Sequence, residues 1–380
     1  MYNQEKDELD IKAMNLIDRA EQLVDERQGK KAIDLYEKAA QIHLDQGNYL
    51  KLDEIYIRIA DIISRFKNNI QSVYRLKSIV RKTEELKLYE ISAKLLMQLA
   101  TVSYKMKDWE TAGESWEKAS NYFYEADPEE FYNLSSLLLL KAGKAYERSN
   151  IKRDQGERLI LKAVMKMNKF DRLYHQDEQR ALSLINREEF KASANKFYEI
   201  SEYFEKAIEN VKELEEDEDD NEAKDMLNNA KARLYHLSGE YRIVASLCLR
   251  APEKREYNDL IKKWGNESIE LLKKSISILK KFLKSEVTGY DKEDILRITF
   301  DVMFLSIIQG TLGKNKIEPI PFLLEELDNQ KLIKSLKESP YFKVSERIEK
   351  VGLLDSLDKI SRAQLGHFEK VKKILIPYFR

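Results

Sequence analysis

Residues that could do chemistry are few and scattered in this sequence. We expect no metal-ligand partner at i+3 or i+4 of any histidine, the spacing at which helical metal sites usually occur; the four are His43, His175, His236 and His367. The single cysteine, Cys248, has no histidine close in sequence to activate it as a nucleophile. We therefore predict no catalytic residue, no metal site and no cofactor, with surface or packing roles for these side chains.

A segment from Gly310 to Asn315 is similar to a phosphate-binding loop but lacks its spacing. Two residues instead of four separate Gly310 from Gly313, and Asn315 stands where Ser or Thr should follow the lysine. The segment also follows a predicted helix instead of a strand. We interpret it as a loop that ends a helix.

The composition favours a helical protein that acts by binding. Of 380 residues, 35% are charged and 43% are hydrophobic, while only 12 are Gly and 6 are Pro. Turn formers are too few for a β-sandwich or barrel, and a formal net charge of -1 argues against general nucleic-acid binding. No apolar run approaches the ~20 residues of a membrane span, and a single cysteine suits a reducing compartment. We predict a cytoplasmic protein, associated with membranes only peripherally through its partners.

A repeated small–aromatic–small pattern predicts helical hairpins. Residues 32–39 and 112–119 both read Ala-x-x-x-aromatic-x-x-Ala, and a small residue, Ala20 or Ala100, precedes each by twelve positions. Small residues let two antiparallel helices approach closely while the aromatic ring fills the groove beside them. The leading residues Ala20, Ala60 and Ala100 are 40 apart, longer than the ~34-residue tetratricopeptide repeat. Less regular units begin at Gly143, Ala181 and Ala232. The predicted fold is an all-α, right-handed solenoid of antiparallel, tetratricopeptide-like hairpins with a C-terminal helical bundle.

Changes in composition divide the chain into four segments. Residues 1–212 carry the hairpin pattern and are expected to form the solenoid. Residues 213–222 contain eight acidic side chains and no basic one, which predicts a solvated connector or frayed helix end, or else an acidic docking strip for a basic partner. Residues 223–290 are interpreted as further hairpins. Residues 291–380, broken into shorter helices by Pro319, Pro321 and Pro340, are expected to form the C-terminal helical bundle.

One predicted helix, residues 267–284, has two possible environments. Five apolar residues form a stripe along it: Ile269, Leu272, Ile276, Leu279 and Leu283. Five lysines stand beside that stripe: Lys273, Lys274, Lys280, Lys281 and Lys284. A basic amphipathic helix can lie on an anionic membrane, or it can pack on a neighbouring helix with its lysines in solvent. We favour packing.

Several segments resemble, in the right order, those of the SNAP proteins, soluble adaptors that bring a AAA+ ATPase to membrane-fusion SNARE bundles. Residues 12–21 are similar to the opening helix of that family, and residues 32–40 with Asn48-Tyr49 to its second helix and turn. Further similar pieces are residues 91–106, 116–124, 135–146 and 339–346. The similar segments are spread over most of the chain. The main evidence for the resemblance is the order of these segments and the 40-residue spacing.

The resemblance implies a non-enzymatic adaptor in membrane fusion and vesicle transport. A concave, partly basic face would bind a SNARE-like coiled-coil bundle, and the C-terminal domain would recruit and stimulate a AAA+ ATPase of the N-ethylmaleimide-sensitive-factor type. Lys94 and Lys141 match basic cargo-facing positions, while Leu137 replaces another. Phe379 matches the penultimate apolar residue that stimulates the ATPase. The membrane-touching loop of the family falls at residues 28–30, which are polar here, so attachment by that loop is not expected.

Other interpretations of these residues stay open. Lys94 and Lys141 could be solvated lysines on amphipathic helices, and Phe379 could belong to a hydrophobic tail folded against the bundle. The whole chain could be a generic tetratricopeptide scaffold or peptide sensor without an ATPase partner, reading short segments through side-chain pockets. An enzyme or a nucleic-acid binder is the remaining class.

Overall fold

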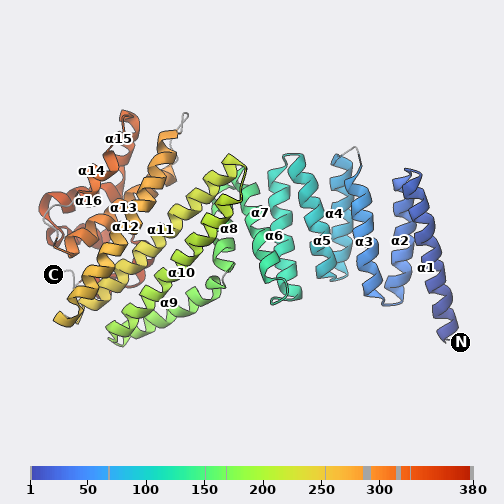
Figure 1. Ribbon diagram of the computed structural model, residues 1–380, viewed down its shortest axis with the longest axis horizontal. Coiled ribbons are helices and arrows are strands. Elements are labelled where there is room, and N and C mark those ends of the chain that lie inside the picture. The colour runs from blue at the N-terminus through green and yellow to red at the C-terminus, as the bar shows by residue number, and fades with distance from the viewer. Residues whose placement is uncertain are drawn as a thin grey trace. The chain divides into compact units, whose positions relative to one another are not determined.

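The structure is built of helices. The computed structural model describes residues 2–66, 69–149, 151–167, 169–252, 254–285, 292–313, 318–325 and 327–376, without the side chains of 2–7, 284 and 285. All regular secondary structure within these ranges is helical (Figure 1). The chain separates into two compact units, residues 1–163 and 164–380. The fold class predicted from the sequence is confirmed.

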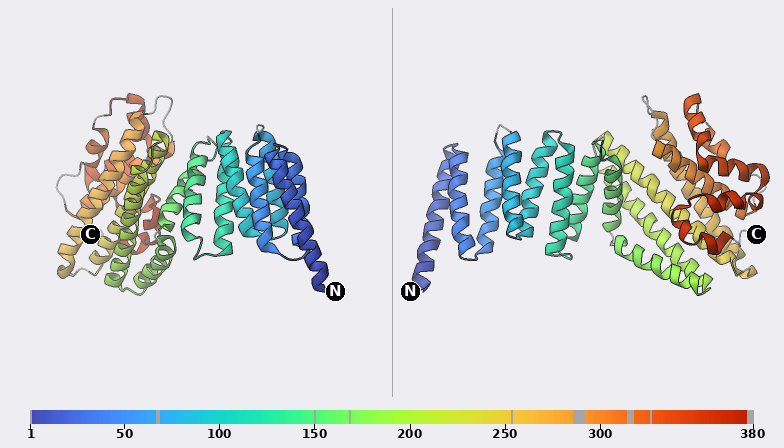
Figure 2. Two further views of the ribbon diagram at one scale, coloured as in Figure 1. Left: turned by 45° about the vertical axis from the view of Figure 1, so that its right-hand side comes forward. Right: turned by 180° about the vertical axis from the view of Figure 1, so that it is seen from behind.

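The first unit is a row of antiparallel helices that stand side by side in each view (Figures 1 and 2). Its helices are α1 (Tyr2–Asp25), α2 (Gly29–Asp45), α3 (Tyr49–Ser64), α4 (Asn69–Glu85), α5 (Tyr89–Lys105), α6 (Trp109–Ala126), α7 (Tyr132–Glu147) and the greater part of α8 (Arg153–Lys166). The even helices α2, α4 and α6 begin at residues 29, 69 and 109, 40 residues apart. The hairpin is therefore the repeating unit, as the spacing of small residues predicts.

Each 40-residue period consists of two helix–turn segments of 20 residues. Four of the turns contain a residue with positive φ, and these residues are 20 or 40 positions apart. They are Arg27 after α1, Gly47 after α2, Lys87 after α4 and Lys107 after α5. After α4, the N–H of Lys87 donates to Glu84 O at 2.9 Å and the N–H of Leu88 donates to Thr83 O at 3.0 Å. This Schellman pattern satisfies carbonyls at the C-terminus of a helix. Glycine suits its left-handed position best, so a lysine there costs about 1 kcal/mol.

The predicted small residues lie inside the helix pairs of the first unit. Seven of them are fully buried: Ala20, Ala32, Ala39, Ala60, Ala100, Ala112 and Ala119. α7 and α8 approach closely at two glycines: a Cβ at Gly143 would lie 2.8 Å from Gly156 O, and one at Gly156 would lie 2.7 Å from Gly143 O. The sequence predicts Gly143 but misses Gly156, because the register shifts by one residue in this pair.

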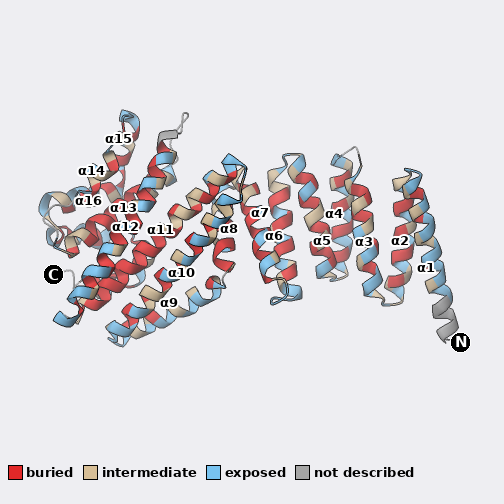
Figure 3. Cartoon of the chain, in the orientation of Figure 1, coloured by how far each residue is buried: buried red, intermediate tan, exposed pale blue. Residues whose placement is uncertain are grey.

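The second unit is centred on long helices. It contains α9 (Phe170–Asn186), α10 (Phe190–Glu216), α11 (Asn221–Arg250), η1 (Arg255–Tyr257), α12 (Asn258–Ser285) and α13 (Lys292–Thr311). Shorter elements follow: α14 (Pro319–Leu324), α15 (Gln330–Glu338), α16 (Pro340–Val351), η2 (Leu354–Ser356), α17 (Leu357–Arg362), η3 (Gly366–Lys370) and α18 (Lys372–Leu375). α11 packs between α10 and α12 and is buried from His236 to Leu249 (Figure 3).

The acidic run at residues 213–222 is an ordered link between α10 and α11. α10 continues to Glu216, and the Asp220 side chain caps the first turn of α11. Glu215 forms an ion pair with Lys231 of α11. The division between the two compact units lies at 163/164, away from this run.

The apolar stripe of α12 is buried within the second unit. Its members are between 0% and 3% exposed: Ile269, Leu272, Ile276, Leu279 and Leu283. Lys280, at 8% exposure, donates a hydrogen bond to Phe322 O at 2.9 Å. The packing interpretation of this helix is therefore confirmed, because the side chains that would enter a membrane are already in the core.

Candidate functional site

Side chains with access to solvent line up on the odd-numbered helices of the first unit. On α3 they occupy positions 50, 54, 58 and 61, which share one face because spacings of four, four and three residues follow the helical repeat. The equivalent positions are 10, 14, 18 and 21 on α1, 90, 94, 98 and 101 on α5, and 133, 137, 141 and 144 on α7. None of these sixteen side chains is buried. We call this set the odd-helix stripe.

Lys94 lies in the stripe but is held by neighbouring carboxylates. Its Nζ is 2.8 Å from Asp53 of α3 and 2.8 Å from Glu90 of its own helix, and the side chain is 30% exposed. Burial by itself lowers the pKa of Lys94, but the hydrogen bonds that it donates to Asp53 and Glu90 outweigh burial and raise the pKa. The charge of this lysine is thus largely neutralised within the first unit.

Lys141 and Leu137 lie one turn apart in the stripe on α7. Lys141 is exposed and forms no ion pair with any residue that the structure describes. Leu137 is 47% exposed and adds an apolar contact point beside Lys141. The third predicted site residue, Phe379, lies outside the described residues.

The charge of the odd-helix stripe changes along the first unit. Its carboxylates lie on α1, α3 and α5: Asp10, Asp18, Glu21, Glu54, Asp61 and Glu90. Arg58 of α3 is bound to Glu21 of α1, with Nη2 2.6 Å from Oε2. Among the cations of the stripe, Lys141 of α7 forms no ion pair with a described residue. Exposed apolar side chains also lie in the stripe: Met14 on α1 (61%), Leu50 on α3 (87%) and Leu137 on α7 (47%).

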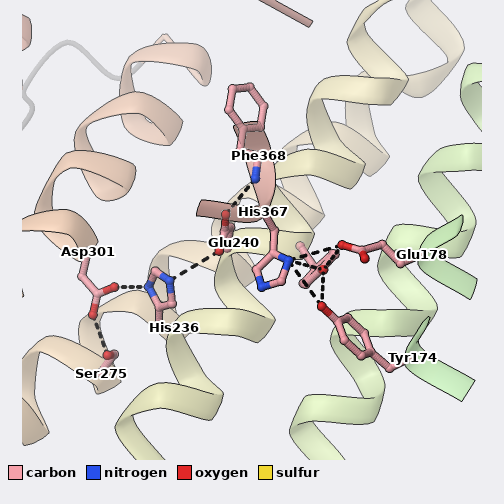
Figure 4. Close-up of polar contacts among 9 residues, drawn as sticks. Tyr174, Glu178, His236, Glu240, Ser275, Asp301, His367 and Phe368 are labelled. Atoms are coloured by element: carbon pink, nitrogen blue, oxygen red, sulfur yellow. Dashed lines mark hydrogen bonds and ion pairs between the residues drawn. The ribbon is translucent and has the colours of Figure 1, made fainter. Parts of the chain in front are cut away.

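The second unit contains a buried polar cluster that joins α11, α12 and α13 (Figure 4). His236 binds Asp301 Oδ1 through Nδ1, and its Nε2 lies 3.4 Å from Glu240 Oε2. The other oxygen of Asp301, Oδ2, accepts a hydrogen bond from the Ser275 hydroxyl at 2.5 Å. His236 and Glu240 are a turn apart on α11, so this helix presents His236 to Asp301 of α13 and Glu240 to Phe368 of η3.

A second group of polar contacts ties the C-terminal segment to α9 and α11. Glu178 of α9 accepts hydrogen bonds from Tyr241 at 2.6 Å and from Lys370 at 2.6 Å. His367 Nδ1 lies 2.9 Å from the Tyr241 oxygen. Because Tyr241 donates its only hydroxyl hydrogen to Glu178, His367 must donate from Nδ1 to Tyr241. The Phe368 N–H donates to Glu240 Oε1 at 2.9 Å, which links the two groups (Figure 4).

The ionisation of these groups follows from their partners. Burial by itself lowers the pKa of His236, but the charge and hydrogen bond of Asp301 outweigh it, so the pKa is raised. Burial raises the pKa of Glu178, yet hydrogen bonds from His367, Lys370 and Tyr241 bring it down to about 2. The pKa of Glu240 is also lowered, against burial, by His236. The shifts of His236 and Glu240 both have the direction expected for a histidine held between two acidic side chains.

A glycine allows the C-terminal segment to reach this cluster. Gly366 has a φ of +55°, and a Cβ at this position would lie 2.8 Å from Glu240 Oε1 and 3.2 Å from the Phe300 ring. A larger residue would push the segment away from Glu240 and break the bond from the Phe368 N–H. The hydrogen bond from the Phe368 N–H to Glu240 therefore depends on having glycine at position 366.

The residue types Ser, His and Asp are present in the cluster, but their order differs from that of a nucleophilic triad. A triad needs the serine hydroxyl against the histidine nitrogen that takes its proton. Here Ser275 donates to Asp301, and both nitrogens of His236 face carboxylates. The arrangement orients and joins helices; it does not activate the hydroxyl.

This cluster is not predicted by the sequence pattern, and the expectation that no histidine has a ligand-type residue at i+3 or i+4 is wrong. Glu240 stands four residues after His236, and Glu178 three residues after His175. The i+4 carboxylate was the available signal for the first pair. No signal could indicate Asp301, because it is 65 residues from His236. Cys248 is fully buried, so of the expected surface or packing roles it has the packing one, and burial raises the pKa of its thiol.

The described residues hold no group of three or more His, Cys, Asp or Glu side chains placed to bind a metal ion. Within the same part of the chain, no helix is long and apolar enough to cross a membrane.

Comparisons with known proteins add little to this geometry. No protein-family model matches the chain, and no curated protein matches it. Among solved structures, the chain is similar to a circular tandem repeat protein with novel repeat topology and enhanced subunit contact surfaces. That likeness covers 98% of this chain and 94% of the other at 13% identity, with a TM-score of 0.27. A likeness of this degree carries no information on function.

Proposed function

We propose that this protein is an adaptor that binds a helical protein partner along the odd-helix stripe of its first unit. The observation that carries the proposal is the recurrence of solvent-accessible side chains at equivalent positions on α1, α3, α5 and α7. A row that crosses four helices matches an elongated partner better than a small ligand. Its mixture of exposed apolar and charged residues is typical of protein interfaces.

The resemblance to SNAP proteins gives this adaptor its specific form. The partner is a SNARE-like coiled-coil bundle, and the C-terminal region recruits and stimulates a AAA+ ATPase of the N-ethylmaleimide-sensitive-factor type. Association with membranes then occurs only through these partners. Lys141 on α7 supplies the positive charge of the contact, and Leu137 supplies an apolar anchor beside it. Lys94 contributes less, because Asp53 and Glu90 already hold its charge.

A generic scaffold without an ATPase partner is the alternative that must be separated from this one. The test uses the full-length protein, a purified four-helix SNARE bundle and the purified ATPase. Binding to the bundle is measured by calorimetry for the wild type, K141E, L137D and the matched control K38E. Lys38 is an exposed lysine on α2, outside the stripe. ATP hydrolysis is measured with and without the protein and bundle.

The adaptor predicts that K141E and L137D each weaken bundle binding about tenfold, that K38E does not, and that the wild type stimulates hydrolysis. Binding should also weaken as salt rises, because charge contributes to it. Bundle binding without ATPase stimulation supports the scaffold instead. Equal losses in K141E and K38E, or no binding at all, refute the stripe as the contact surface.

A further inference from the structure

A pocket in the second unit lies directly against the buried His236–Asp301–Ser275 cluster. It has a volume of about 580 Å³ and is lined by residues of α11, α12, α13 and α16 and by Gln364 and Gly366 at the start of η3. Pockets that hold small organic molecules usually measure about 300–1,000 Å³. The size of this pocket is therefore that of a small-molecule site, and it does not coincide with the odd-helix stripe, which belongs to the other unit.

The polar floor of the pocket is already satisfied. His236 and Asp301 bind each other, and Ser275 donates to Asp301. All three are buried, at 4%, 1% and 0% exposure. Because these groups use their charges and hydrogens on one another, they fix the shape of the floor and leave the recognition of a ligand to the rim.

The rim carries positive charge that the protein does not neutralise. Arg233 is half-buried and lines the pocket, and it forms no ion pair or hydrogen bond with any residue in the described ranges. Lys292, at the start of α13, is exposed and likewise forms no ion pair within those ranges. By contrast, Arg297 is bound to Asn229 at 3.1 Å. Of the lining residues, four are cationic when His236 is protonated, and two, Glu293 and Asp301, are carboxylates.

The walls between floor and rim are apolar. Phe300 and Tyr341 meet edge to face, with ring centroids 4.8 Å apart, and both line the pocket. Leu279 and Leu296 complete this lining, and Leu296 is 40% exposed. A half-exposed leucine beside two rings leaves apolar surface uncovered, and a ligand with an apolar body would cover it.

We propose that this pocket binds one small amphipathic organic anion. The apolar body of the ligand packs against Leu279, Leu296, Phe300 and Tyr341. Its carboxylate faces Arg233, which can form two parallel hydrogen bonds to it, and Lys292 adds a second positive charge. The protein then has a small-molecule site in its second unit, independent of the protein-binding stripe in its first.

The experiment measures binding of decanoate to the full-length protein by calorimetry below its micellar concentration. Decylammonium supplies the same body with the opposite charge, and inorganic phosphate supplies an anion without the body. R233Q removes the predicted carboxylate partner, and L296D places a negative charge on the apolar wall. R180Q, at an exposed arginine of α9 outside the pocket, is the matched control. Circular dichroism confirms that each variant is folded.

The expected result is one decanoate per chain, with binding about tenfold weaker in R233Q and in L296D and unchanged in R180Q. Decylammonium and phosphate should bind at least tenfold more weakly than decanoate. The proposal is overturned if decanoate does not bind, or if it binds at several sites with an affinity that L296D does not change. It is also overturned if decylammonium binds as tightly, or if R180Q and R233Q have equal effects. None of these outcomes depends on the SNARE bundle or the ATPase.

Discussion

Replacing Glu178 by glutamine should destabilise the second unit, and by an amount that depends on pH. Glu178 is the carboxylate on which Tyr241, His367 and Lys370 converge, and its side chain is 8% exposed. Glutamine has the shape of a protonated glutamate but cannot carry the charge. The substitution therefore removes at neutral pH the negative charge that protonation would remove in acid.

The magnitude follows from the pKa of Glu178, which is lowered from 4.5 to about 2 in the folded protein. Each pKa unit corresponds to about 1.4 kcal/mol of differential stability. After allowing for the half-exposed Lys370, E178Q should lower the free energy of unfolding by about 2–3 kcal/mol at pH 7. A lowered carboxyl pKa gives stability that is complete above pH 4.5 and is lost as pH falls toward 2. At pH 3 the difference between the proteins should be less than about half of its value at pH 7.

Urea unfolding followed by the fluorescence of Trp264 measures this directly. Trp264 is 5% exposed and belongs to the second unit, whereas Trp109 and Trp116 belong to the first. A W109F/W116F background therefore isolates the transition of interest. E202Q, at an exposed glutamate of α10, is the control and should have no effect at either pH. The reasoning is refuted if E178Q costs less than about 0.5 kcal/mol at pH 7, or if its cost is the same at pH 3.

Three further predictions concern helix packing, turns and the histidine of the buried cluster. G143A should lower the free energy of unfolding by at least about 1 kcal/mol, although alanine is the better helix former, because its Cβ would meet the Gly156 carbonyl; urea unfolding followed by circular dichroism checks the sign. K87G and K107G should each raise thermal stability, by about 0.5–1 kcal/mol, because both lysines have positive φ; a lower melting temperature in either would contradict the turn assignment. The raised pKa of His236 contributes stability that is complete below about pH 6.5 and is lost as pH rises through the folded pKa. The free energy of unfolding that Trp264 fluorescence reports should therefore fall in alkali in the wild type and not in H236Q.

The repeat architecture could be predicted because its cause is local. Ala20 and Ala100 each face a partner helix twelve residues on, so a fixed spacing reports a steric requirement that recurs in every hairpin. Gly156 was missed when that spacing shifted by one residue. The 20-residue turn period was also missed, because three of its four left-handed positions, Arg27, Lys87 and Lys107, are not glycines.

The buried cluster lies beyond such reasoning because its members come from distant parts of the chain. Ser275 and Asp301 are 26 residues apart, and His236 and Asp301 are 65 apart. Long-range packing of α11, α12 and α13 alone brings them together. The same limit applies to Lys94, whose charge was expected to face a partner. Its neutralisation by Asp53 depends on the neighbouring helix α3.

Site-specific photo-crosslinking tests the central claim, that the odd-helix stripe contacts a helical protein partner. A benzophenone amino acid is introduced at position 14 on α1, at position 137 on α7 and, as a control, at position 38 on α2. Each protein is irradiated with the four-helix SNARE bundle, and products are resolved by mass. Crosslinks from positions 14 and 137 but not from 38 are expected. Bundle binding with crosslinks from position 38, and none from 14 or 137, would contradict the account.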